Sequence, residues 1–283
     1  MSVSIAFFGL ASTPCAAPAA EAAASAAVRH AAPKVPEYMH QFDMLTRKID
    51  TLLMHQRLGD IAIIDEIQYA SVPGRKDPAN PWQSEGPLRI PAFTFVPKDL
   101  GSRKVPLVVF VHGGVHGNFG GASEIKMTRE LLEQGYAVIA PEYRGSTGYG
   151  SELYNQIDYG GTEIDDTHAA RNWAVENLPN VDGSRVGIIG WSHGGLHSLL
   201  TVFRWPDDYQ VAYAGVPASD LVQRMGYSGE EYNTLFASFI CETASEDPGE
   251  FRRLSPLFHS DNLRTPLLFN TATNVGDLNV IEV

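Results

Sequence analysis

The chain has 283 residues, of which 44% are hydrophobic and 19% are charged, a composition typical of a globular protein and unlike that of a disordered or fibrous one. Its 33 acidic and 21 basic residues give a formal net charge of −12, which disfavours nucleic acid or an anionic lipid surface as a partner, because both are negatively charged. No apolar stretch approaches the roughly 20 residues needed to cross a bilayer, so the sequence predicts no membrane span.

Residues 1–38 are predicted to be a secretory leader or a disordered Ala/Pro-rich tail. Residues 3–11 form a short apolar core, and residues 12–27 are rich in small residues with several A-x-A-like cleavage sites, although no positive charge precedes the core. A genuine leader implies a secreted or periplasmic protein, and otherwise a cytoplasmic one is expected. Residues 39–283 are expected to form one domain.

The first part of this domain is predicted to contain one helix and two strands. Residues 40–58 indicate an amphipathic helix that packs on the rest of the domain, because apolar residues recur at three-and-four spacing, at Phe42, Leu45, Ile49, Leu52 and Leu53. Residues 61–70 and 89–97 are rich in β-branched and aromatic residues and predict two leading antiparallel strands.

From residue 105 onward, apolar strands alternate with helices. The predicted strands are 106–113, 136–143, 185–192, 211–219 and 266–271, and the predicted helices lie near 122–134, 163–177 and 194–204. This alternation predicts the α/β class, with a mostly parallel, doubly wound sheet that has helices on both faces. Residues 220–262 predict a helical insertion above the carboxyl ends of the strands.

Residues 190–194, with the sequence GWSHG, come directly after a predicted strand and lead into a predicted helix. This is the pattern of a nucleophile elbow, in which the serine occupies a strained turn and the glycines let strand and helix approach. GxSxG alone also occurs in ordinary strand-to-helix turns, but the strand before it and the small residues after it favour a catalytic role for Ser192.

Attack by a serine on a carbonyl carbon also needs N–H donors for the negative charge that develops on the oxygen. His112, Gly113 and Gly114 form a glycine-rich turn at the end of an earlier predicted strand and could supply them. The backbone N–H of His193, the residue after the nucleophile, is the other predicted donor. These four residues are therefore the predicted oxyanion hole.

From about residue 45 to its end, the chain resembles the hydrolase domain of the prolyl oligopeptidase family, within the α/β-hydrolase superfamily. The resemblance rests on HGGVHG (112–117), PEYRGSTGYG (141–150), VDGSRVGIIGWSHGG (181–195) and RTPLLFNTATNVGDLNVIEV (264–283). It implies a serine peptidase, with substrate-binding positions at Tyr143, Tyr149 and Trp191. The family's β-propeller is not expected, because too few residues precede the first motif.

Nearby charged residues have simpler interpretations. Arg144 is explained at least as well by a structural salt bridge as by a role in the site. Asp165 and Asp166 are interpreted as caps or dipole partners at the start of the 163–177 helix.

In this fold an acid comes after the next-to-last strand and a histidine after the last one. The resemblance implies an aspartate where the sequence has Val275, and Asp277 is the candidate acid if the loop is shifted. The alternative is that Asp277 is a simple turn residue and that the acid has been lost. Because the sequence ends at Val283, the last strand, the last helix and the family's histidine are predicted to be missing. His116 and His193 are the nearest histidines, but neither is favoured as a replacement base.

The predicted function is therefore a serine hydrolase that acts on a peptide or ester bond through an acyl-enzyme on Ser192, impaired by an incomplete triad. A non-catalytic binding or scaffold protein and a small-molecule carboxylesterase are the alternatives. No cofactor and no metal are predicted, because HExxH-like, GxGxxG and Walker patterns are absent from the sequence. A sheet edge left open at 266–271 predicts self-association.

Overall fold

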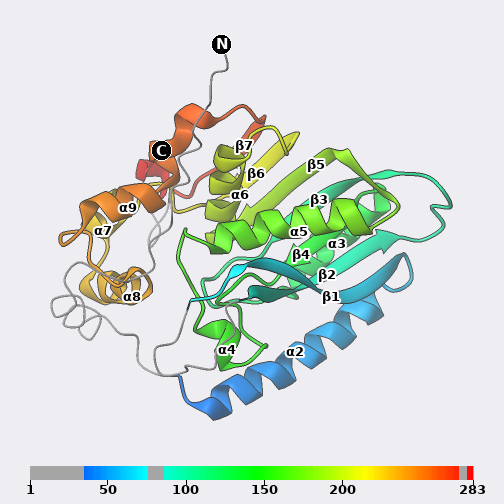
Figure 1. Cartoon of the computed structure of the whole chain (residues 1–283), viewed down its shortest axis with the longest axis horizontal. Helices are drawn as coiled ribbons and strands as arrows, with labels where there is room; N and C mark the ends of the chain where they lie inside the picture. Colours follow the sequence, from blue (N-terminus) through cyan, green and yellow to red (C-terminus); the bar gives the residue numbers. More distant parts are fainter. Residues whose placement is uncertain (1–34, 76–85, 274–278, 283) are drawn as a thin grey trace.

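The computed structural model describes residues 35–75, 86–273 and 279–282 (Figure 1), so residues 1–34 of the predicted leader and Asp277 lie outside the described residues. In this part of the chain seven strands form one sheet, in the order β1-β2-β4-β3-β5-β6-β7. They are β1 (Ala62–Pro73), β2 (Pro87–Pro97), β3 (Val105–Val111), β4 (Ala137–Pro141), β5 (Val181–Trp191), β6 (Val211–Gly215) and β7 (Leu267–Asn270).

Strand pairing agrees with the prediction. β1 pairs antiparallel with β2, and β2 antiparallel with β4, whereas all pairs from β4 to β7 are parallel. Val111 at the end of β3 is paired with Gly190 near the end of β5, so the HGG turn and the GWSHG turn leave the same edge of the sheet. The sheet thus brings the two predicted halves of the site together.

Helices cover both faces of the sheet (Figure 1). α5 (Glu163–Asn177) and α6 (His193–Arg204) pack on one face, and α2 (Glu37–Leu58) and α3 (Ala122–Glu133) pack on the other. Successive residues of β3 point to opposite faces. Val109 belongs to the core under α5 and α6, and Val108 belongs to the core under α2 and α3. The predicted doubly wound α/β fold is confirmed.

The shorter helices gather at one end of the sheet, where Figure 1 shows α7, α8 and α9 together. The predicted insertion holds α7 (Leu221–Tyr227), α8 (Glu230–Ile240), α9 (Pro248–Leu254) and the 3₁₀ helix η1 (Pro256–Asn262); α4 (Ser151–Tyr154) and η2 (Asn279–Glu282) lie outside it. Apolar residues of α7, α8 and α9 form a third core with Leu196 and Leu200 of α6. None of the helices described is long and apolar enough to cross a membrane.

The helix α2 is confirmed, but the prediction of its packing face is wrong. Its predicted apolar side chains are exposed by 62%, 57%, 51% and 70% at Phe42, Leu45, Ile49 and Leu52. The buried face instead carries His40, Arg47, Met54 and Leu58. The reason is Arg47, whose guanidinium lies 4.0 Å from the centre of the Phe93 ring and 3.4 Å from the carboxylate of Glu142. A buried ion pair and a cation–π contact therefore decide which face packs.

β7 is at one end of the strand order, with β6 as its neighbour in the sheet. Leu268 on this strand is 65% exposed. An exposed apolar residue on an edge strand is a feature that favours pairing with another chain. Self-association through β7 stays a prediction.

Candidate active site

Ser192 lies between the end of β5 and the first turn of α6, with backbone angles of φ 54° and ψ −117°. A non-glycine residue with positive φ is strained, and such strain is typical of functional sites. The backbone N–H of Ser192 donates to the carbonyl of Gly215 at 2.8 Å, which ties the turn to the neighbouring strand β6. The residue is exposed, as expected when an elbow presents its hydroxyl to a substrate.

The glycines beside Ser192 are needed for close approach of backbones. A Cβ atom on Gly194 would lie 2.3 Å from the carbonyl oxygen of Val111, and one on Gly190 would lie 2.2 Å from the carbonyl oxygen of Gly194. Both distances are far shorter than a van der Waals contact. Glycine at these positions therefore lets α6 begin directly against the ends of β3 and β5.

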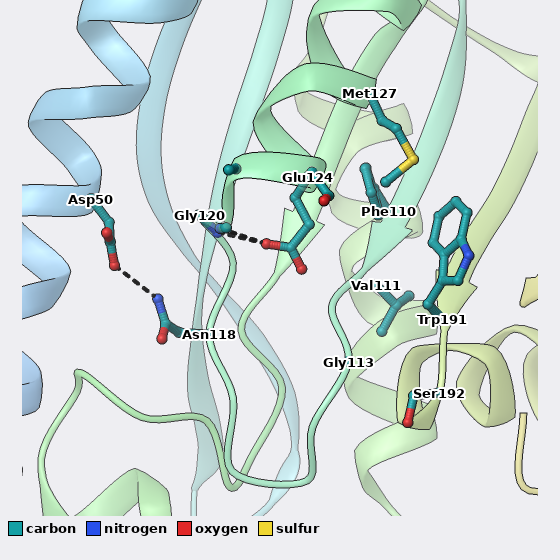
Figure 2. Close-up of a pocket in the computed structure, with 13 residues that line it drawn as sticks. Asp50, Phe110, Val111, Gly113, Asn118, Gly120, Glu124, Met127, Trp191 and Ser192 are labelled. Carbon is teal, nitrogen blue, oxygen red and sulfur yellow. Dashed lines mark hydrogen bonds between the residues drawn. The ribbon is translucent and has the colours of Figure 1, made fainter. Parts of the chain in front are cut away.

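Ser192 lines a cavity of about 700 Å³ between the HGG turn and α3. Figure 2 shows Ser192 and Gly113 at one end of the cavity and Phe110, Met127 and Trp191 toward the other. A Cβ atom built on Gly113 would lie 3.7 Å from the Cβ of Ser192, so the backbone of the turn faces the serine closely. The cavity thus combines a hydroxyl, a glycine-rich backbone and an apolar wall.

The HGG turn is held from behind by side chains. Gly114 has a φ of +76°, and its carbonyl oxygen accepts a hydrogen bond from the Tyr143 hydroxyl at 2.7 Å. The ring of Tyr143 stacks on that of His112 with 4.3 Å between the ring centres, and both side chains are buried. The oxyanion roles of the backbone N–H groups of Gly113, Gly114 and His193 stay predictions.

Glu142 braces the same turn from the α2 side. Its buried carboxylate accepts the backbone N–H of Phe119 at 3.1 Å and lies 3.3 Å from Nε2 of His112. Burial lowers the pKa of His112, but the hydrogen bond and charge of Glu142 outweigh it, and the pKa is raised overall. Tyr149 donates to Glu142 at 3.4 Å and accepts from Nε of Arg47 at 2.8 Å.

The three residues predicted to bind substrate occupy two different places. Trp191 lines the cavity, whereas Tyr143 and Tyr149 lie behind it and brace the HGG turn. A contact of either tyrosine with substrate stays a prediction. Neither Glu142 nor Arg47 was identified from the sequence as part of the site. The available signal for Glu142 was a carboxylate inside the apolar run 136–143.

Arg144 forms the structural salt bridge that was one of its two interpretations, and its partner is Asp166, at 2.8 Å. The interpretation of Asp166 as a helix cap is corrected, since its buried carboxylate points to Arg144 and the N-cap residue of α5 is Thr162. Asp165, beside it, lies 3.8 Å from Arg204.

The histidines near the site are engaged with other groups. Nδ1 of His116 lies 2.7 Å from the carbonyl oxygen of Gly145, and burial lowers the pKa of this ring. The side chain of His193 is buried under the elbow and faces Glu163. Within the described part of the chain, neither imidazole forms a hydrogen bond with Ser192.

Glu163 joins two histidines in a cluster that the sequence did not reveal. Nε2 of His193 lies 2.9 Å, and Nε2 of His197 3.4 Å, from Oε1 of Glu163. Burial raises the pKa of Glu163, but the two imidazoles outweigh it and the pKa is lowered, whereas burial lowers the pKa of His197 to about 4. The available signal was the spacing of His193 and His197, four residues apart on a predicted helix.

Comparison with known proteins agrees with this geometry. The profile of the prolyl oligopeptidase family matches residues 124–281. A peptidase of Bacillus subtilis, YuxL, is 32% identical over 211 residues, which are 74% of this chain and 30% of that protein. The acylamino-acid-releasing enzyme of Arabidopsis thaliana is 28% identical over 176 residues, 59% of this chain and 23% of that enzyme. The chain therefore spans less than a third of the length of these relatives.

Solved structures show the same fold. An acylaminoacyl peptidase in complex with Z-Gly-Gly-Phe-chloromethyl ketone superposes with a TM-score of 0.62 at 23% identity, over 74% of this chain and 32% of that one. The uncomplexed acylaminoacyl peptidase of Pyrococcus horikoshii gives 0.61 at 22% identity, over 74% and 31%. The family profile covers more than half of the chain and includes the serine elbow. The chain therefore belongs to the prolyl oligopeptidase family.

Proposed function

We propose that this protein is a serine hydrolase in which the hydroxyl of Ser192 attacks the carbonyl carbon of a peptide bond and forms an acyl-enzyme. The observation that carries the proposal is the position of Ser192. It is exposed, held at φ 54° between a strand and a helix, and closely faces the backbone of Gly113 at the same end of the cavity. Strain at an exposed serine opposite a glycine turn fits nucleophilic attack and serves no packing purpose.

The cavity supports a preference for substrates with an apolar side chain. Phe110, Met127 and Trp191 form an apolar wall of the cavity whose other end holds Ser192, and burying an apolar group against it contributes about 25 cal/mol per Å² of area. Its two carboxylates already have partners, since Asp50 accepts from Asn118 and Glu124 accepts from the backbone N–H groups of Gly120 and Gly121. The named activities of the relatives make peptides the favoured substrate class, with small esters as the alternative.

We further propose that acylation by the described residues is slow. A serine hydroxyl needs a base within hydrogen-bond reach, and in the described part of the chain none of the imidazoles of His112, His116, His193 and His197 forms a hydrogen bond with Ser192, since each ring faces another group. An enzyme that lacks such a base keeps the catalysis that comes from the oxyanion hole and from substrate binding. If the acylation rate falls to nothing, the protein is a non-catalytic binding protein, which is the alternative proposal.

Labelling with a fluorophosphonate probe tests this proposal. We expect one label per chain in the wild type and none in Ser192→Ala. Ser123→Ala is a matched control, because Ser123 is exposed and lines the same cavity but lies in the ordinary first turn of α3. This control should be labelled like the wild type.

The labelling result also separates the alternatives. Labelling that persists in Ser192→Ala would disprove the nucleophile assignment, and no labelling of folded wild type at any pH would favour a binding protein. Turnover of p-nitrophenyl esters without cleavage of any peptide would favour the esterase.

A further inference from the structure

Three buried side chains from two helices converge directly under the nucleophile elbow. Glu163 lies in the first turn of α5, and His193 and His197 lie one turn apart on the same face of α6. One ligand atom from each, a ring nitrogen or a carboxylate oxygen, lies within 4.8 Å of the other two. All three side chains are at most 4% exposed.

The side chains of this cluster lie close together, but several of their buried polar atoms have no hydrogen-bond partner among the described residues. Within the described structure Nε2 of His193, Nε2 of His197 and Oε2 of Glu163 are buried without a hydrogen-bond partner. The nitrogen of His193 is only 2.9 Å from Oε1 of Glu163, so what is missing is the direction of a hydrogen bond and not the proximity. Buried polar atoms are nearly always satisfied, and three orphans around one point indicate a shared ligand.

Thr167 holds the ring of His197 in place. The Thr167 hydroxyl lies 2.8 Å from Nδ1 of His197 and 3.5 Å from the main-chain carbonyl oxygen of Glu163. Nε2, the other ring nitrogen of His197, is directed at the cluster, 3.4 Å from Oε1 of Glu163. Histidines that bind metals are commonly oriented in this way by a hydrogen bond from the other ring nitrogen.

The charge and the donor types select the class of ligand. Two imidazoles and one carboxylate meet in a buried site, flanked by Tyr159 at 4.6 Å from His193 and Tyr143 at 4.3 Å from His197, measured between ring centres. A cation with affinity for nitrogen and oxygen together fits this set. Zn²⁺ commonly binds two histidines and one glutamate, whereas Mg²⁺ and Ca²⁺ prefer oxygen ligands.

We propose that Glu163, His193 and His197 form a Zn²⁺ site. The ion would join the start of α5 to the start of α6, and His193 would connect it to the nucleophile, because His193 is the residue directly after Ser192. This site is separate from the substrate cavity and does not depend on the proposed hydrolase activity.

Metal binding by the 283-residue chain tests the proposal. After treatment with a chelator, the wild type should take up one Zn²⁺ per chain, measured by mass spectrometry of the metal content and by titration calorimetry. Zn²⁺ should raise the melting temperature, since a ligand that binds only the folded state stabilises it, and Mg²⁺ should not. Co²⁺ should give the strong visible absorption of a four-coordinate site.

Substitutions locate the ion. Glu163→Gln and His197→Gln should each weaken Zn²⁺ binding by more than about tenfold, the lower limit found even for residues that only orient metal ligands. His55→Gln removes an exposed histidine of α2 and should leave the affinity unchanged. Ser192→Ala should also bind Zn²⁺ normally, so a failure of the hydrolase proposal is distinguishable from a failure of this one.

Three outcomes would overturn the proposal. The first is wild type that takes up no stoichiometric Zn²⁺, and the second is unchanged affinity in both variants, which would place the ion elsewhere. If neither variant folds, as judged by circular dichroism, the wild-type Co²⁺ spectrum decides. A weak spectrum like that of hydrated Co²⁺ would mean that the cluster holds water or a shared proton instead.

Discussion

Asp166 holds the guanidinium of Arg144 in a two-point ion pair. Oδ2 of Asp166 accepts from Nε of Arg144 at 2.8 Å, and Oδ1 accepts from the Nη2 group at 2.8 Å. The backbone N–H of Arg144 also donates to Oδ2, at 2.9 Å. Arg144 lies just after β4 and Asp166 in the first turn of α5, so the pair fixes the loop after β4 to the helix that carries Glu163.

Asp166→Asn should lower the free energy of unfolding by about 3–5 kcal/mol, because it leaves a buried guanidinium without its counter-charge. Denaturation in urea measures the change. Asp165→Asn is the control on the same helical turn: Asp165 is only partly buried, its cation is 3.8 Å away, and a loss of no more than about 1 kcal/mol is expected. Equal losses in the two variants would contradict a special role for the Arg144 pair.

Gly194→Ala should both destabilise the protein and abolish labelling of Ser192. The added methyl group would lie 2.3 Å from the carbonyl of Val111, so the start of α6 must move away from β3 and take the elbow with it. Overpacking of this kind typically costs about 1–3 kcal/mol. Thermal unfolding and fluorophosphonate labelling are the two measurements.

Gly226→Ala is the matched control for this prediction. Gly226 lies in helix α7, and a methyl group there would meet nothing within 4 Å. Alanine is favoured over glycine in helices by about 1 kcal/mol, so a small gain in stability and unchanged labelling are expected. Normal labelling in Gly194→Ala would show that the elbow does not require this close approach.

Substitutions on the apolar face of α2 should affect the free energy of unfolding less than substitutions on the opposite face, which is the reverse of what the hydrophobic pattern predicts. Leu52→Ser should change the free energy of unfolding by no more than about 0.5 kcal/mol, because Leu52 is 70% exposed. Met54→Ala should cost about 2–5 kcal/mol, because Met54 is fully buried in the core with Phe93 and Phe95. Chemical denaturation of both variants decides, and a larger loss for Leu52→Ser would mean that the predicted face packs after all.

This reversal shows which parts of the fold a sequence can predict. The strands from residue 105 onward were predictable, because runs of β-branched residues fit a sheet that is covered on both faces. The predicted strand 211–219 was too long, since Val216 adopts a positive φ of 42° and β6 ends at Gly215. The buried face of α2 was not predictable, because Arg47 is held there by Phe93 and Glu142, which are distant in the sequence.

The candidate site divides in the same way. Ser192 and the HGG turn could be predicted, because a local motif at the end of a strand fixes their geometry. Glu163 could not, because its carboxylate becomes significant only when α5 packs beside α6 and brings it to His193. The four-residue spacing of His193 and His197 was an available signal for half of that cluster, but it was not used, and only the fold showed the third member.

His168 predicts how stability depends on pH. Its ring stacks on Trp205 with 3.9 Å between the ring centres and lies 3.5 Å from the carboxylate of Asp208. Burial lowers the pKa of His168 from 6.5 to about 4, because the opposing effect of Asp208 is weaker and Arg171 adds to the decrease. The folded protein therefore keeps this imidazole neutral under mildly acidic conditions.

The unfolded chain takes up a proton on His168 near pH 6.5, whereas the folded protein takes it up only near pH 4. The free energy of unfolding should therefore fall as the pH drops from about 7 to 4, with a contribution of up to about 3 kcal/mol from this residue. His168→Gln removes the titrating group, so urea denaturation across this range should give a shallower decrease than in the wild type. Identical curves for wild type and His168→Gln would refute the assignment.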